Sequence, residues 1–300
     1  MALLIVERTN ARYLPGVVFP DSLQAVATLE ECLAGVRDIL VAVPSHGLRS
    51  TLIAIKPHLA GDSRVCWATK GFELHTGKLP HQVVAEELGA DIPVAVLSGP
   101  TFAKEVGAHL PTAMTVAAND GEFAADLAEA LSGDKFRAYT SDDMIGVEVG
   151  GAVKNVLAIG AGMSDGLGFG ANARVAMITR GLVEMTRLGV ALGAKKETFM
   201  GLAGMGDLVL TCTDNLSRNR RMGLALASGK TVAEAQEEIQ QVVEGVKAAK
   251  AVHDVAEELG IEMPIANQVY RILYEGVAPR EAVEALMTRE LKPEAEATTL

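Results

Sequence analysis

Short apolar runs alternate with helical patterns in the first half of the chain. Apolar and β-branched runs predict buried strands over residues 39–43, 65–68, 94–97, 112–117 and 136–139. Apolar residues at helical spacing predict helices over 45–59, 78–88 and 122–131, with a short helix from Thr101. Strands that alternate with helices favour a parallel sheet covered on both faces. We therefore predict an α/β domain over residues 1–141.

The pattern changes near residue 141, because strand-like runs become few. Long amphipathic patterns predict helices over residues 145–163, 172–192, 220–227, 232–239, 245–259, 267–274 and 279–287. We therefore predict an all-helical domain over residues 142–300, with a polar tail after Lys292 that frays.

Composition and charge narrow the function. The 27 Lys and Arg against 38 Asp and Glu give a net charge of −11, which repels a nucleic-acid backbone. An anionic ligand therefore needs a local cationic site. The three cysteines and six histidines lack the spacing of a metal site, and the odd, scattered cysteines fit a reducing cytoplasm. No run of about 20 apolar residues predicts a membrane span, so we expect a soluble cytoplasmic protein.

Three successive predicted strands end in small, hydroxyl or cationic residues. The three turns read Pro44-Ser-His46, Thr69-Lys-Gly71 and Ser98-Gly-Pro-Thr-Phe-Ala-Lys104. In an open parallel sheet, ligands bind outside the carboxyl ends of the strands. Each turn is therefore a candidate site, although any one of them can equally be an ordinary strand-to-helix turn. Lys70 is the most informative, because exposed lysines usually occupy helix faces.

A second cluster lies inside an apolar helical pattern, where Gly150-Gly-Ala-Val-Lys-Asn155 is flanked by buried residue types. Burial of Lys154 lowers its pKa toward the range of a useful general acid or base. The paired glycines weaken the helix and allow another backbone or a ligand to approach. The alternative is a lysine whose stem is buried and whose ammonium group reaches solvent.

A third group follows, comprising Gly201-Leu-Ala-Gly-Met-Gly-Asp207, Thr211 and then Ser217-Arg-Asn-Arg-Arg221. Ser217 is a good N-cap, and a helix N-terminus with Arg218 beside it is a ready anion site. Arginines there supply the cationic focus that an acidic protein needs for a phosphate. The alternative is a solvated basic helix end, particularly for Arg220 and Arg221.

Together these residues resemble a known family. The motifs Asn10-x-Arg-Tyr-Leu-Pro-Gly16, Trp67-Ala-Thr-Lys-Gly71, Ser98–Lys104, Gly150–Asn155, Gly204-x-Gly-Asp207, Ser217–Arg220 and Val242-Val-Glu-Gly245 closely resemble bacterial NAD(P)-dependent glycerol-3-phosphate dehydrogenase. The match runs from about residue 9 to 292. It implies a Rossmann-like parallel-sheet domain, truncated at its N-terminus, over 1–141, and a helical substrate and catalytic domain over 142–300.

The resemblance also implies roles. Lys154 is expected to be the proton donor and acceptor and to touch substrate. The other expected substrate contacts are Lys70, Gly99, Thr101, Asp207, Ser217, Arg218 and Asn219. The expected NAD(P)H contacts are Lys70, Ala103, Arg218, Val242 and Glu244, and Asn155 and Thr211 are expected to lie beside the catalytic group in a supporting role. The implied reaction is hydride transfer between NAD(P)H and dihydroxyacetone phosphate, giving sn-glycerol 3-phosphate for phospholipid synthesis.

The physical reading of these residues agrees with that reaction. Reduction of a ketone builds negative charge on its oxygen, which a protonated Lys154 can stabilise and then quench. Lys70 would strengthen that field, and two nearby ammonium groups lower each other's pKa. Asp207 could orient either Lys154 or a substrate hydroxyl.

The sequence departs from the family at its start, where the GxGxxG turn and its flanking strands and helix are absent. We therefore expect weak cofactor binding by this chain. Three hypotheses stay open: a working reductase whose true start lies upstream, a truncated non-catalytic remnant, or another two-domain dehydrogenase such as a 3-hydroxyacid dehydrogenase. The Arg218 cluster speaks against the last. The expected partner is a small phosphorylated molecule, without nucleic acid or a membrane span, and a homodimer is allowed.

Overall fold

Five short strands form one sheet in the first half of the chain, each built from apolar and β-branched residues. The computed structural model describes residues 2–291 and 293–294. Its strands are β1 (Asp38–Val41), β2 (Arg64–Trp67), β3 (Val94–Ser98), β4 (Thr112–Ala118) and β5 (Phe136–Ser141). All five predicted strands are therefore present, with ends that differ by one or two residues.

The sheet has the order β1-β2-β3-β4-β5, and one pair departs from the predicted parallel arrangement. β1, β2 and β3 are parallel, as are β4 and β5, but β4 runs antiparallel to β3 with Leu97 opposite Val116. The connection from β3 to β4 carries only the five-residue helix α5 (Ala103–Gly107). A parallel crossover usually packs a helix of several turns against the sheet, and α5 is too short to do so. The connection instead re-enters the sheet at the end where β3 finishes, and β4 then runs back alongside β3 in the opposite direction.

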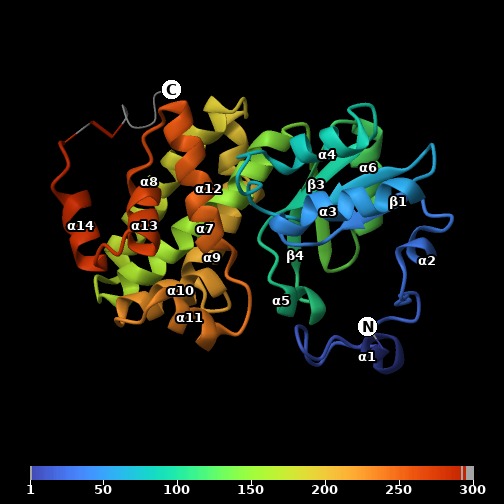
Figure 1. Ribbon diagram of the computed structural model, residues 1–300, viewed down its shortest axis with the longest axis horizontal. Helices are drawn as coiled ribbons and strands as arrows, with labels where there is room; N and C mark the ends of the chain where they lie inside the picture. The colour runs from blue at the N-terminus through green and yellow to red at the C-terminus, as the bar shows by residue number, and fades with distance from the viewer. Residues whose placement is uncertain (1, 292, 295–300) are drawn as a thin grey trace.

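Helices cover both faces of the sheet, as the alternating pattern predicts. Val65 and Trp67 of β2 share one apolar cluster with α3 (Ser45–Ile55) and α4 (Pro80–Leu88). Cys66, between them, belongs to a second cluster with Phe123 of α6 (Gly121–Leu131). Two short helices precede the sheet, α1 (Ala2–Glu7) and α2 (Leu29–Leu33); in Figure 1, α2 lies at the right beside β1 and α1 lies below the sheet.

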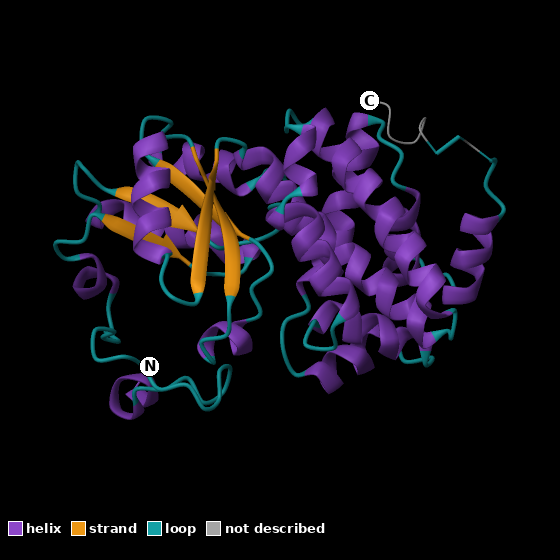
Figure 2. Cartoon of the chain, turned by 180° about the vertical axis from the view of Figure 1, so that it is seen from behind, coloured by secondary structure: helices purple, strands orange, loops and turns teal. Residues whose placement is uncertain are grey.

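The second half is helical, and Figure 2 shows the orange strands in the half of the molecule opposite this group of helices. Its α-helices are α7 (Met144–Gly166), α8 (Gly170–Ala191), α9 (Asp207–Thr213), α10 (Arg218–Ala227), α11 (Val232–Ile239), α12 (Glu244–Leu259), α13 (Pro264–Tyr274) and α14 (Pro279–Met287). A 3-10 segment, η2 (Lys196–Met200), and a π-helical segment, η3 (Leu202–Gly206), precede α9. The mainly parallel sheet followed by helices confirms the predicted Rossmann-like fold class.

The long helix α7 joins the two halves. It contacts β3, β4 and α4 at its start and α8, α9, α10, α12 and α13 farther along (Figure 1). Asp143 caps it by accepting a hydrogen bond from the Gly146 amide at 2.9 Å, and its carboxylate also accepts from the Lys195 amide at 2.9 Å. This cap fixes the start of α7 against the segment that leads to η2.

The composition of α7 would also suit a membrane span, with a mean hydropathy of 1.4. However, 89% of its most apolar window is buried inside the protein. Such burial is typical of the core helix of a soluble protein.

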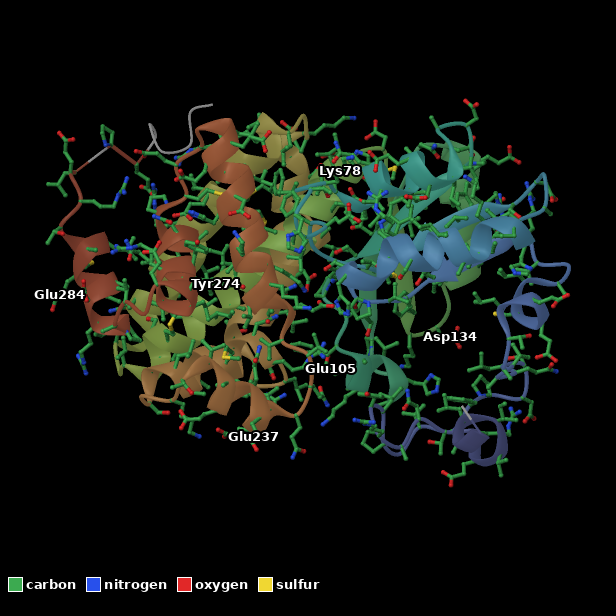
Figure 3. The ribbon with its side chains drawn as sticks, viewed as in Figure 1. Lys78, Glu105, Asp134, Glu237, Tyr274 and Glu284 are labelled. Carbon is green, nitrogen blue, oxygen red and sulfur yellow. The ribbon has the colours of Figure 1, made fainter. Side chains whose placement is uncertain are left out.

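Polar contacts also hold the helices around α7 to one another. The Tyr274 hydroxyl of α13, labelled in Figure 3, donates to the Val246 carbonyl of α12 at 2.9 Å.

The structure differs from the predicted pattern just before α9. The segment before α9 was not predicted to be helical, because its glycines and its π-helical turns do not follow the 3.6-residue period. The tail predicted to fray lies largely outside the described residues, which exclude Lys292 and 295–300. The division into domains at residue 141 stays a prediction.

Helices α7 and α10 pack so closely that a glycine is required at their contact. A methyl group added to Gly223 would overlap the Ile159 carbonyl oxygen and lie 2.7 Å from the Met163 nitrogen, both backbone atoms of α7. We therefore expect Gly223→Ala to lower the free energy of unfolding by about 1–3 kcal/mol. Chemical denaturation measures this change. Gly133→Ala is the matched control, because nothing lies within 4 Å there. Equal stability of the two variants would contradict the packing account.

Candidate active site

The turn after β2 carries Lys70 toward the start of α7. The Thr69 hydroxyl donates to the Val43 carbonyl at 2.7 Å, which ties this turn to the end of β1. The aliphatic stem of Lys70 then runs beside Gly151, where an added methyl group would lie 3.4 Å from Lys70 Cγ and Cδ. The second glycine of the pair at 150–151 thus leaves room for the lysine side chain.

A buried carboxylate joins two lysines from different halves of the chain. Lys70 Nζ lies 2.8 Å from one oxygen of Asp207, and Lys154 Nζ pairs with the other oxygen. Lys154 Nζ also donates to the Thr211 hydroxyl at 3.2 Å. Asp207 is 1% exposed and Lys154 is 7% exposed, so water screens this ion pair little. The structure therefore brings together four of the predicted site residues.

Glycines and the π-helical segment place Asp207 against Lys154. Gly150 of α7 abuts the Ala203 carbonyl of η3, where an added methyl group would lie 2.5 Å from that oxygen. Asp207 is the first residue of α9, directly after η3, and Thr211 follows one turn later on the same face. The Thr211 hydroxyl donates back to the Asp207 carbonyl at 2.6 Å. The close contact at Gly150 thus fixes how near α9 comes to α7.

Burial and the neighbouring charges shift the protonation of Lys154 and of Asp207. Burial lowers the pKa of Lys154 to about 8; the charge of Asp207 opposes this shift, and the charge of Lys70 adds to it. Burial by itself would raise the pKa of Asp207, but the two lysines outweigh burial and hold that pKa below its usual value. Asp207 therefore stays ionised, while Lys154 can gain or lose a proton near neutral pH.

The end of β3 carries a buried hydroxyl group, that of Ser98, which has no hydrogen-bond partner within the described part of the chain. Ser98 is 2% exposed, and among the described residues its hydroxyl is one of two buried side-chain polar atoms without a hydrogen-bond partner. It lies beside Gly151 and the Lys70 stem. Gly99 follows, where an added methyl group would lie 2.9 Å from Met114 Cα. The Thr101 hydroxyl donates to the Gly99 carbonyl at 3.3 Å, so Thr101 fixes this turn.

These features fit the cofactor that the family resemblance implies. The carboxamide of a nicotinamide ring needs hydrogen-bonding groups, and the buried Ser98 hydroxyl is an unsatisfied one at the strand ends where dinucleotides bind. Three further predicted cofactor contacts lie farther along the chain. Ala103 is an exposed residue at the start of α5, Glu244 begins α12, and Val242 is 50% exposed just before it.

A second polar chain links α7, α10 and α12. The Asn219 side-chain amide donates to the Asn155 side-chain oxygen at 2.8 Å, and its own oxygen accepts from the Gly245 amide at 2.9 Å. The Ser217 hydroxyl accepts from the Arg220 amide at 3.2 Å, so Ser217 is the N-cap of α10 as predicted. Asn155 follows Lys154 directly, and this chain therefore fixes the start of α10 relative to the lysine.

The arginines of α10 divide into two kinds. The side chain of Arg218 is exposed at the first position of the helix. Arg220, by contrast, is 7% exposed; it pairs with Asp165 and donates to Asn215 at 3.0 Å. The reading of Arg220 as a solvated basic residue is therefore wrong, because a carboxylate from the end of α7 compensates its burial.

One polar cluster near the site is not among the residues that the sequence predicts. Glu148, on α7, is 3% exposed and accepts hydrogen bonds from the Trp67 indole at 3.1 Å and the His81 amide at 2.9 Å. Its second oxygen lies 2.5 Å from His81 Nδ1. A carboxylate inside an otherwise apolar helical pattern was the signal that could have identified it.

Comparison with known proteins gives a consistent family. Residues 1–124 match the model for the N-terminus of NAD-dependent glycerol-3-phosphate dehydrogenase, and residues 143–284 match the model for its C-terminus. Glycerol-3-phosphate dehydrogenase [NAD(P)+] of Photobacterium profundum is 57% identical over 295 residues, which cover 98% of this chain and 87% of the relative. The enzyme of that name from Nitrosococcus oceani is 58% identical over 294 residues, covering 98% and 86%.

Solved structures agree with the sequence relatives. The crystal structure of glycerol-3-phosphate dehydrogenase from Coxiella burnetii superposes with a TM-score of 0.93 at 51% identity, covering 96% of this chain and 88% of that one. The glycerol-3-phosphate dehydrogenase of Saccharomyces cerevisiae gives a TM-score of 0.82 at 30% identity, covering 94% and 84%. This chain thus shares both its sheet half and its helical half with these proteins.

The charge of Lys70 is expected to be one reason why Lys154 titrates near neutral pH. In Lys70→Met that charge is gone, so the pKa of Lys154 should rise above its starting value of about 8. Carbon-13 NMR of labelled lysine side chains follows this titration, and loss of the signal in Lys154→Arg assigns it. Lys250→Met removes an equal charge from an exposed pair with Asp254 on α12 and serves as the control. A pKa that moves equally in both variants would refute the coupling.

Proposed function

The chain belongs to the family of NAD(P)-dependent glycerol-3-phosphate dehydrogenases, and we propose that the Lys70–Lys154–Asp207 cluster is its active site. The enzyme is an oxidoreductase that uses NAD(P)H. Its reaction is hydride transfer between NAD(P)H and dihydroxyacetone phosphate, which gives sn-glycerol 3-phosphate, a precursor of glycerophospholipids. The observation that carries the assignment is the pair of ammonium groups on one buried carboxylate.

Lys154 is the proton donor in this proposal. When the ketone carbon of the substrate is reduced, negative charge develops on its oxygen, and the reaction needs a group that stabilises this charge and then protonates it. The chemistry that a bound nicotinamide cofactor supplies is the hydride itself. Lys154 is ionised below pH 8 and is buried, so its charge acts with little screening. In the oxidation direction the neutral amine accepts the proton.

Asp207 and Thr211 orient that proton donor. Each accepts a hydrogen bond from Lys154 Nζ, which leaves one N–H of the ammonium group for the substrate oxygen. Asp207 neutralises one of the two positive charges, and the remaining charge favours an anionic substrate. Lys70 adds a second donor at the same point and keeps the pKa of Lys154 low.

The start of α10 holds the substrate phosphate in this account. Ser217 caps the helix, and free amides at a helix N-terminus together with its dipole attract anions. Arg218 adds a guanidinium group that can bind phosphate through two hydrogen bonds. Asn219 is fixed by Asn155, so this anion site has a set position relative to the neighbouring Lys154.

Other residues would hold the cofactor and the substrate near the strand ends. Ser98, beside the predicted substrate contacts Gly99 and Thr101, offers its unpartnered hydroxyl to the nicotinamide carboxamide. Ala103, Val242 and Glu244, with Lys70 and Arg218, would line the remaining cofactor path. We also propose that residues 1–141 form the dinucleotide-binding domain and residues 142–300 the catalytic domain.

A cytoplasmic location fits this function, because the reaction partners are small and water-soluble. A homodimer is also consistent with it. Sedimentation velocity of the purified chain distinguishes a dimer from a monomer by mass.

Replacement of Lys154 tests the proposed proton donor. Lys154→Ala should reduce the rate of ketone reduction by about 10²- to 10⁴-fold, the usual contribution of a general acid. In the unsubstituted enzyme the rate of reduction should be constant at low pH and fall as pH rises through about 8, as the ammonium group deprotonates. The rate of oxidation should show the opposite dependence. NADPH absorbance follows both, and a near-normal rate in Lys154→Ala would remove this residue from its role.

Replacement of Arg218 tests the phosphate site. Arg218→Ala should raise the KM for dihydroxyacetone phosphate at least about tenfold, because a charge-assisted hydrogen bond contributes about 1.5–3 kcal/mol. At saturating NADPH, which offsets the loss of Arg218 as a proposed cofactor contact, the same variant should change the KM for unphosphorylated dihydroxyacetone much less, since that substrate has no phosphate to bind. Lys230→Ala, just beyond the other end of α10, removes the same charge and is the control. An unchanged KM in Arg218→Ala would place the phosphate elsewhere.

A further inference from the structure

A buried carboxylate outside the proposed catalytic cluster connects the two elements that carry its lysines. Glu148 lies on α7, the helix of Lys154, and accepts a hydrogen bond from Trp67, the last residue of the strand that leads to Lys70. It also accepts from the His81 amide in the first turn of α4. Both of these donors reach the same oxygen, and His81 Nδ1 lies 2.5 Å from the other, so each oxygen has a partner from the sheet half of the chain.

The contact between Glu148 and Trp67 is the first of three contacts that are regularly spaced along α7. Glu148, Gly151 and Lys154 follow one another at intervals of three residues, so they lie on neighbouring positions of one helix face. Glu148 contacts Trp67, Gly151 contacts the Lys70 stem, and Lys154 contacts Asp207. The segment from Trp67 to Lys70 therefore runs along α7 and is attached to it at its beginning.

Burial makes the attachment specific. Trp67 is 0% exposed and Glu148 is 3% exposed, so the indole N–H would lose its partner without gaining water if the strand slipped along α7. Burial raises the pKa of Glu148, and its hydrogen bonds from His81 and Trp67 oppose that shift. A protonated His81 ring compensates the charge of the carboxylate. Burial lowers the pKa of His81, but its hydrogen bond to Glu148 and the charge there raise it more, which keeps the ring charged to higher pH than usual.

We propose that Glu148 is a positioning residue for the reduction: it holds the strand end that carries Lys70 at a fixed place along the helix that carries Lys154. The proposal rests on the proposed function, in which Lys70 and Lys154 act together on the substrate oxygen. Without Glu148 the strand end can shift, Lys70 moves relative to Asp207, and the field at the substrate oxygen weakens. Misplacement of a catalytic group by about 1 Å can reduce a rate by about a hundredfold.

Glu148→Ala and Glu148→Gln form the central comparison. Ala removes every acceptor, so we expect kcat to fall at least about tenfold, with a smaller change in the KM for dihydroxyacetone phosphate. Gln keeps an oxygen for the Trp67 and His81 N–H groups and should restore most of kcat. Trp67 is the sole tryptophan of the chain, and its fluorescence reports this contact directly. Its emission should shift in Glu148→Ala and stay unchanged in Glu148→Gln.

A second buried carboxylate supplies the matched control. Glu184 on α8 is 4% exposed and accepts from the Ile265 and Ala266 amides at 2.7 and 3.1 Å, at the start of α13. Glu184→Ala should lower the melting temperature while the folded enzyme keeps its kcat. If Glu148→Ala likewise loses stability but keeps kcat and the titration of Lys154, then Glu148 is only structural and the proposal is overturned.

Two further variants keep the test decisive. If Glu148→Ala does not fold, Trp67→Phe removes the indole donor while keeping an aromatic ring, and a wild-type kcat in that variant overturns the proposal. Lys154→Ala separates this proposal from the proposed function. High activity in Lys154→Ala overturns the assignment of the active site. Inactivity there together with full kcat in Glu148→Ala overturns the positioning role alone.

Discussion

The ion pair between Lys154 and Asp207, inside the protein and shared with Lys70, is the interaction on which the site depends. An isolated ammonium group would lose much of its hydration there, and burial alone would favour its neutral form. Asp207 restores the charged form enough that the pKa of Lys154 lies at about 8, while Lys70 prevents complete compensation. The group can therefore both donate and accept a proton under physiological conditions.

The fold supplies this arrangement through close backbone contacts. Gly150 lets η3 approach α7, Gly151 leaves room for Lys70, and Gly245 lets α12 approach Asn155 and Asn219. The antiparallel return from β3 to β4 keeps the Gly99 and Thr101 turn at the strand ends. The glycine content of the chain thus serves substrate turns and helix contacts. Of these contacts, the one at Gly151 joins the two halves, while those at Gly150 and Gly245 hold η3 and α12 against α7 and its neighbours within the helical half.

Much of the fold could be predicted because local pattern and final structure agree. The helix over 232–239 and the strands of the sheet follow directly from the apolar periodicity. The antiparallel pairing of β3 and β4 could not be predicted, since pairing depends on the path of the connection rather than on the strand residues. The π-helical turns before Asp207 were also missed, because they break the period from which helices are recognised. Burial of Arg220 depends on Asp165, a partner 55 residues away in the chain.

The candidate site shows the same division. Lys70, Lys154 and Asp207 could be named from motifs and from a family resemblance, but no spacing rule indicates that one carboxylate joins both lysines. Glu148 could not be identified from the sequence because it lies in an apolar pattern that predicts burial, and its partners Trp67 and His81 come from distant parts of the chain.

The most direct measurement is the pH dependence of NADPH oxidation with dihydroxyacetone phosphate in Asp207→Asn. Loss of the Asp207 charge should move the inflection near pH 8 to lower pH, with a reduced maximum rate; an inflection that stays in place would contradict the account.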